Sequence, residues 1–142
     1  MRAIARSVLA VLLGLVVGFV LVAVIGTVSH QVFPPPPGIH SGDPEAQKAA
    51  IARIPLGAFL FILVGWSSGA LAGSWLAARI AIRSPFLHGL VVGMLFVITG
   101  IAAMFMLPHP LWFRIVGTAA PLLAGFCGAK LGVVATSRQA RA

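Results

Sequence analysis

The sequence predicts an all-α membrane protein: a bundle of four transmembrane helices with one long outer loop that carries a polyproline stretch and a short interfacial helix. The chain of 142 residues is 60% hydrophobic and only 8% charged, whereas a soluble domain of ordinary composition has about 25% charged residues. Four apolar runs are each long enough to cross a hydrocarbon core of about 30 Å. Because so small a domain cannot hide this much apolar surface in one core, we expect lipid to surround a single integral membrane domain, residues 1–142.

The first predicted span is Val8–Val28, which would be about 31 Å long as a helix. Arg2 and Arg6 precede it, as basic residues precede the apolar region of a secretory signal peptide. That region is only about 7–15 residues long and ends at a small-residue cleavage site. The run in this chain is longer and has no such cleavage pattern after it, so we expect a retained span.

Residues 29–55 form the predicted outer loop. The four prolines of Pro34–Pro37 fix φ and supply no N–H, so this stretch must be extended. The run Asp43-Pro44-Glu45 is typical of a helix start, because Asp caps, Pro suits the first helical position and Glu favours the positive end of a helix. We expect a short helix from there to about Ile54, lying on the membrane surface.

The other three spans are predicted at residues 56–78, 86–107 and 111–135. Ser84-Pro85 separates the second span from the third, and Pro108-His109-Pro110 separates the third from the fourth. A proline inside either connection cannot continue a helix cleanly, because it lacks the N–H and restricts the residue before it.

The basic residues predict the orientation. With the N-terminus in the cytoplasm, seven Lys and Arg residues lie on the inner side and three on the outer side, together with both carboxylates. The inner set is Arg2, Arg6, Arg79, Arg83, Lys130, Arg138 and Arg141, and the outer set is Lys48, Arg53 and Arg114. Since Lys and Arg accumulate in short cytoplasmic loops, both termini are expected in the cytoplasm, with the inner basic residues on anionic lipids. Such flanks account for the net charge of +8, so we expect no nucleic-acid binding.

Glycines predict how the helices are held together. Fourteen of the 16 glycines lie in the predicted spans, and each span has at least one pair spaced by four positions. The candidate packing positions are Gly14, Gly18, Gly65, Gly69, Gly73, Gly89, Gly93, Gly125, Gly128 and Gly132. Small residues let helix backbones approach closely in lipid. We expect them to pack this chain's own helices; the alternative is that some join copies in a homo-oligomer or contact another membrane protein.

Arg114 and Thr118 form the first candidate site. Arg114 lies one turn inside the fourth span and Thr118 one turn deeper. An ionisable residue at membrane depth marks a functional site by default, and this pair would bind an anion or a lipid headgroup. The alternative, which we favour, is that Arg114 only extends outward to lipid phosphate beside Trp112 at the interface.

His30, His40 and His109 form the second candidate site, on the outer side. Imidazoles can ligate zinc or copper, with Asp43 and Glu45 on the same side. No two of these histidines have a helical ligand spacing, and all three border loops, so we expect no metal and no cofactor. No span contains Asp or Glu, no catalytic motif is present, and the single cysteine, Cys127, is expected to be a packed thiol. We therefore expect no enzymatic activity.

The chain resembles a group of small bacterial four-span inner-membrane proteins with no known activity. The stretches that carry the resemblance are Phe33-Pro34-Pro35-Pro36-Pro37-Gly38 with Asp43-Pro44-Glu45, Gly69-Ala70-Leu71-Ala72-Gly73-Ser74-Trp75-Leu76-Ala77-Ala78-Arg79, and Pro108-His109-Pro110-Leu111-Trp112-Phe113. The resemblance implies a bacterial plasma membrane and no particular activity. Small multidrug transporters share the number of spans, but they carry an acidic residue in the first span that this chain lacks.

The sequence is consistent with three functional hypotheses. The first is a non-enzymatic small subunit or accessory protein that acts through helix and lipid contacts. The second is a passive transporter or anion-handling pore lined by Arg114 and Thr118. The third, an enzyme or metal protein that uses the outer histidines, has the least support.

Overall fold

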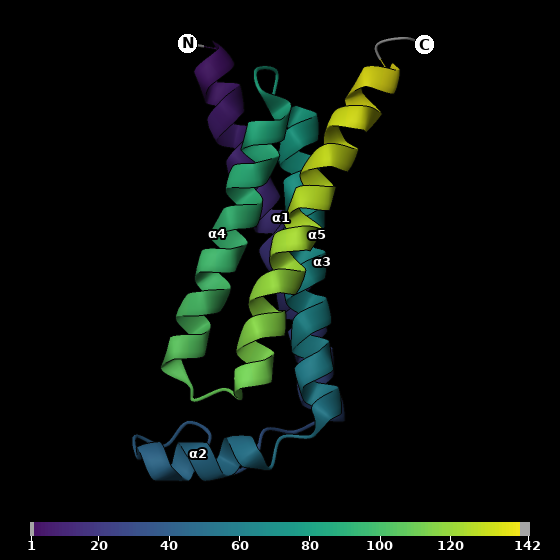
Figure 1. Cartoon of the computed structure of the whole chain (residues 1–142). Coiled ribbons are helices and arrows are strands. Elements are labelled where there is room, and N and C mark those ends of the chain that lie inside the picture. Colours follow the sequence, from purple (N-terminus) through teal and green to yellow (C-terminus); the bar gives the residue numbers. More distant parts are fainter. Residues whose placement is uncertain (1, 140–142) are drawn as a thin grey trace.

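A computed structural model describes residues 2–139. Within this part of the chain the protein is all-α (Figure 1), with helices α1 (Arg2–Val32), α2 (Pro44–Ala52), α3 (Leu56–Ile80), α4 (Pro85–Met106) and α5 (Leu111–Gln139). Four of them, α1, α3, α4 and α5, are long and apolar enough to cross a membrane. The predicted all-α bundle of four helices that could span a membrane, with a short helix between the first and the second, is confirmed.

The four long helices run side by side, and α2 lies across one end of the bundle (Figure 1). The start of α1 and the end of α5 are both at the opposite end, on different sides of the bundle. Helix α3 packs against α1, α4 and α5, whereas α1 packs against α3 and against a small part of α4. Helix α3 is therefore the centre of the bundle, and α1 is its most peripheral long helix.

Helix α1 ends later than the sequence predicted. It continues to Val32, so the beginning of the expected loop 29–55 is helical. The N–H of Phe33 still donates to the Ser29 carbonyl at 2.7 Å, and helical bonding stops where Pro34–Pro37 supply no donors. The polar residues after residue 28 end the apolar run, but polarity does not break a helix. Helix α1 also begins earlier than the predicted span, at Arg2 rather than Val8, and α5 ends at Gln139, four residues after the predicted residue 135. The remaining predicted span ends differ from the structure by at most two residues, which is usual at helix ends.

Helix α2 begins as predicted. The Asp43 side chain accepts a hydrogen bond from the Glu45 N–H at 3.1 Å, and Pro44 occupies the first turn. The helix ends at Ala52, before the expected residue 54, because the next two N–H groups bond to carbonyls three residues back, at 3.0 and 3.1 Å. This tighter turn precedes Pro55, which disfavours a helical conformation in the residue before it.

Helices α1 and α3 cross in backbone contact. A Cβ on Gly14 would lie 2.6 Å from the Gly73 carbonyl oxygen, and a Cβ on Gly73 would lie 2.6 Å from that of Gly14. Gly18 and Gly69 are related in the same way, at 2.6 and 2.7 Å. Gly65, the next glycine along α3, has only contacts of ordinary length. The first two pairs set the antiparallel register of the two helices, because no larger residue fits at either position.

Helix α5 packs against α3 through a second glycine row. A Cβ on Gly128 would overlap the Leu71 carbonyl oxygen, and a Cβ on Gly132 would lie 2.6 Å from that of Trp75. Both partners advance by four positions, so this packing is parallel. Helices in lipid gain little free energy by burying apolar side chains against each other, because lipid is equally apolar. Van der Waals contact between closely approaching backbones stabilises the bundle instead.

Ser74 lies where α3, α4 and α5 meet. Its side chain is fully buried, and its Oγ has no hydrogen-bond partner in the part of the chain that the structure describes. A Cβ on Gly93 would lie 3.0 Å from this oxygen, and one on Gly125 would lie 3.3 Å from it. A Cβ on Gly89 would lie 2.7 Å from the Ser74 carbonyl oxygen. The three helices are therefore packed without space between them at this level.

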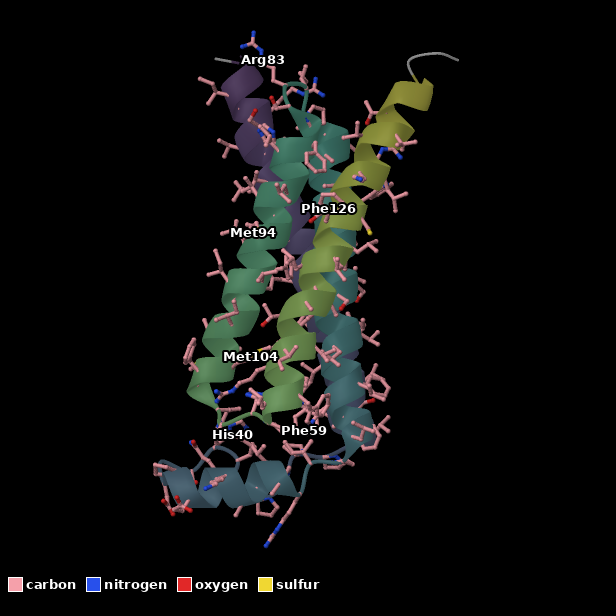
Figure 2. All side chains as sticks on the ribbon, in the orientation of Figure 1. His40, Phe59, Arg83, Met94, Met104 and Phe126 are labelled. Atoms are coloured by element: carbon pink, nitrogen blue, oxygen red, sulfur yellow. The ribbon has the colours of Figure 1, made fainter. Side chains whose placement is uncertain are left out.

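An aromatic cluster holds the loop and α2 onto the bundle. Phe113 has no exposed surface, and four rings surround it with centroids 5.0–5.9 Å away: Phe59, Trp66, His109 and Trp112. Residues of the loop and α2 complete the buried cluster, which comprises Ile39, Ala50, Ile51, Phe59, Leu63, Met104 and Phe113. Figure 2 shows Phe59 and Met104 at the α2 end, far from Arg83 at the other end of the bundle.

Candidate functional site

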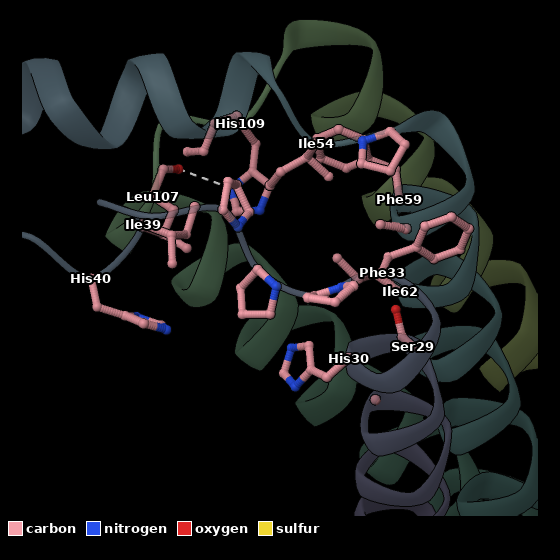
Figure 3. A pocket seen from close by; sticks show the side chains of 17 residues that line it. Ser29, His30, Phe33, Ile39, His40, Ile54, Phe59, Ile62, Leu107 and His109 are labelled. Carbon is pink, nitrogen blue, oxygen red and sulfur yellow. Dashed lines mark hydrogen bonds between the residues drawn. The ribbon is translucent and has the colours of Figure 1, made fainter.

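A pocket of about 180 Å³ lies between the loop and the adjoining end of the bundle (Figure 3). We call it the loop pocket. Its walls come from the end of α1, the polyproline stretch, the end of α2, the start of α3 and the connection between α4 and α5. It is lined by Gly26, Ser29, His30, Phe33, Pro34, Pro35, Pro36, Ile39, His40, Ile51, Ile54, Pro55, Ala58, Phe59, Ile62, Leu107 and His109. The lining is mostly apolar, and its polar side chains are three imidazoles and one hydroxyl.

The end of α1 contributes unpaired acceptors beside this pocket. In a continuing helix the carbonyls of residues 30–33 would accept from the N–H groups of residues 34–37, and these four residues are all proline. The last helical bond at this end runs from the Phe33 N–H to Ser29. In the described part of the chain no other donor bonds to the carbonyls of residues 30–33. The polyproline stretch thus leaves the negative end of the α1 dipole without donors.

His109 is held in one orientation. Its Nδ1 lies 2.9 Å from the Leu107 carbonyl oxygen (Figure 3), and its ring stacks on Phe113 with an interplanar angle of 16°. A carbonyl oxygen only accepts, so the proton of this bond is on Nδ1. In the neutral ring Nε2 then carries a lone pair and is a hydrogen-bond acceptor.

The folded loop brings the three outer histidines to one pocket, which their spacing in the sequence does not indicate. His30, His40 and His109 all line the loop pocket. In Figure 3 His30 and His40 lie on the side away from Phe59, and Ser29 lies one helical turn before Phe33. No group of three His, Cys, Asp or Glu side chains in residues 2–139 lies close enough to hold a metal ion. The ring nitrogens of these histidines are hydrogen-bond donors or acceptors at the pocket.

Arg114 and Thr118 also share a pocket. It lies between α4 and α5, has a volume of about 230 Å³, and is lined in addition by Ile101, Met104 and Phe105. We call it the α4–α5 pocket. The Thr118 hydroxyl donates to the Arg114 carbonyl at 2.8 Å, while the Arg114 side chain is exposed on the flank of the bundle. This pair therefore lies at the lateral surface, beside the highly exposed Phe105.

Basic side chains at the other end of the bundle lie over aromatic rings. The Arg79 guanidinium lies 5.1 Å from the centre of the Trp75 ring, and Lys130 Nζ lies 4.6 Å from that of Phe126. Cys127, in contrast, is exposed, so the expectation of a packed thiol was wrong. Small neighbours in the sequence do not determine which side of a helix a residue occupies. Arg141 lies outside the described residues.

Sequence reasoning missed Ser29, which is buried and lines the loop pocket. Two features of the sequence could have identified it. Ser29 lies just before His30 at the end of an apolar run, and a stretch without N–H donors, Pro34–Pro37, follows. It also missed Phe59 and Phe113, because only the parallel packing of α3 against α5 places the start of one helix beside the start of the other.

Comparison of the chain with known protein families, with curated proteins and with solved structures gave no match.

Proposed function

We propose that this chain is a non-enzymatic protein of the bacterial plasma membrane that acts through contacts with lipids and with other membrane helices. That it is a multi-pass membrane protein follows from its four long apolar helices. The observation that carries the proposal is the α4–α5 pocket: a guanidinium at the flank of the bundle, next to apolar side chains of α4. This combination fits a lipid whose phosphate meets Arg114 and whose acyl chain lies along α4.

An anion-handling pore lined by Arg114 and Thr118 is the alternative, and the geometry supports it less. The α4–α5 pocket opens at the flank of the bundle, where the Arg114 side chain is exposed. Farther along the bundle, α3, α4 and α5 are in contact around the fully buried Ser74. A path for ions through the interior would need space at that level.

Lipid binding at Arg114 is tested by measuring retained lipid. We expect Arg114→Gln to reduce the phosphatidylglycerol bound to the purified protein about tenfold, because a charge-assisted bond to phosphate is lost. The measurement is native mass spectrometry after controlled delipidation. Arg53→Gln, an exposed arginine after α2, is the matched control and should retain the wild-type amount. Equal retention in both variants, or anion flux into liposomes that falls on Arg114→Gln, would refute the lipid proposal and favour the pore.

We further propose that α1 offers a surface for another membrane helix, from a second copy or from a different protein. Among the described helices, α1 packs against α3 and a small part of α4, and valine and leucine side chains along its outer side are exposed. In a membrane this surface meets lipid unless a partner covers it.

Both termini are proposed to be cytoplasmic, with the loop and α2 on the outer side. The start of α1, the end of α5 and Arg83 lie at one end of the bundle, and α2, with both carboxylates, lies at the other (Figures 1 and 2). Lys and Arg mark the cytoplasmic side, where they contact anionic lipids.

Cysteine labelling tests this orientation. In a Cys127→Ser background we expect Gly42→Cys, in the exposed loop, to react with a membrane-impermeant maleimide in intact spheroplasts. The matched site at the other end of the bundle is Ile82, which lies in the α3–α4 turn and is 58% exposed. We expect Ile82→Cys to react only after lysis. The reverse pattern would invert the topology, and labelling of both sites in intact spheroplasts would contradict a single orientation.

A further inference from the structure

We propose that the loop pocket binds a neutral phenol or hydroquinone ring with an apolar tail, and that a ring hydroxyl donates a hydrogen bond to His109 Nε2. This site is separate from the α4–α5 pocket and does not depend on lipid binding there.

The size of the pocket fits one substituted ring. A cavity of about 150 Å³ lined by apolar side chains is large enough for benzene, and the loop pocket measures about 180 Å³. Phe33 and Phe59 contribute aromatic surface to the walls, against which a flat ring packs favourably.

The polar groups of the pocket select a ligand that donates hydrogen bonds. His109 Nε2 is an acceptor because Nδ1 is bonded to the Leu107 carbonyl. The carbonyls of His30 and Phe33, two residues that line the pocket, are further acceptors, since the prolines four positions after them supply no N–H. The Ser29 hydroxyl forms no hydrogen bond with the described residues, and it can donate to or accept from a second oxygen on the ring.

The lining also argues for a neutral ligand. No Lys, Arg, Asp or Glu lies among the residues that line the pocket. A charged head would lose its water there without an opposite charge to replace it, which is costly in an apolar environment. A hydrocarbon chain would fill the pocket but would leave its acceptors unpaired, so a hydroxylated ring suits the lining better.

The apolar tail can follow α1 into the membrane. Gly26 lines the pocket one turn before Ser29, and a Cβ placed on Gly26 would have no atom within 4 Å. An alkyl chain that passes this open position would run along α1 into the hydrocarbon of the bilayer.

The test compares two probes that differ only in their donors. Decyl-hydroquinone and its dimethyl ether are titrated into the protein in nanodiscs under reducing conditions, and binding to empty nanodiscs is subtracted. We expect the hydroquinone to bind about tenfold more tightly than the ether, since the ether cannot donate to His109. Equal affinities would mean that the pocket takes any hydrocarbon and would overturn the proposal, as would the absence of saturable binding.

Two variants make the test specific. His109→Phe keeps a ring to stack on Phe113 but removes the acceptor, so hydroquinone affinity should fall to that of the ether while ether affinity stays unchanged. Unchanged ether binding shows that the variant is folded. Gly26→Leu should reduce the affinity of both probes by filling open space. His88→Phe, at the start of α4, is the control and should bind both probes as wild type does. Retention of the hydroquinone preference in His109→Phe would overturn the assignment.

Discussion

Gly128→Leu is expected to separate α5 from α3 and to prevent formation of the native bundle. A Cβ at this position would overlap the Leu71 carbonyl oxygen and lie 3.0 Å from the carbonyl carbon and 3.1 Å from the Cα of the same residue. These are backbone atoms, so no side-chain rotation can relieve the clash, and one helix must move. We expect a loss of at least about 3 kcal/mol of stability, the upper part of the range for overpacked sites. Thermal unfolding and size-exclusion chromatography in detergent measure it.

Gly26→Leu is the matched control. It makes the same substitution in another long helix, at a glycine whose added Cβ would have no atom within 4 Å. Glycine also disfavours helix by about 1 kcal/mol relative to residues such as alanine, so this variant should be as stable as wild type or slightly more stable. If the two variants lost stability equally, the glycine contacts between α3 and α5 would not be what holds these helices together.

Phe113→Ala is expected to have the second largest effect, by releasing the loop and α2 from the bundle. Phe113 is completely buried and contacts four other rings, including those of Phe59 and His109. Removal of a buried phenylalanine costs about 3–5 kcal/mol in water-soluble proteins. We expect about 3 kcal/mol here, because part of the unfolded reference state is in lipid, which reduces the transfer contribution and leaves the loss of packing.

Limited proteolysis of the loop, together with thermal unfolding, measures this effect. Phe105→Ala is the control, since Phe105 is 84% exposed and its truncation should change stability by less than about 0.5 kcal/mol. A Phe113→Ala protein whose loop resists protease as well as wild type would show that the aromatic cluster does not fix the loop.

Local chemistry explains what could be predicted from the sequence. The apolar runs specify four spans because hydrocarbon thickness sets their length, and Asp43 caps α2 through its own side chain. Proline stops helices wherever it removes donors. Each of these effects acts within a few residues, so one segment of sequence contains all the information.

The parts that could not be predicted depend on contacts between segments. His30 and His109 are nearly 80 positions apart, and they line one pocket only because the loop folds back over the end of the bundle. Arg114 and Thr118 could be placed on one side of a helix, but their apolar neighbours come from α4. The sequence predicts the end of the first span at residue 28, where polar residues begin, but polar residues do not end a helix and α1 continues to Val32.

The peripheral position of α1 has a consequence for biosynthesis. As the ribosome delivers the chain to the translocon, α1 must partition into the bilayer before α3, its main partner among the described helices, has been made. It is the most apolar of the four spans, and α5, the last to emerge, is the least apolar. The first helix can therefore insert without a partner. The last helix enters a membrane that already contains α3 and α4, and its glycines can pack against them.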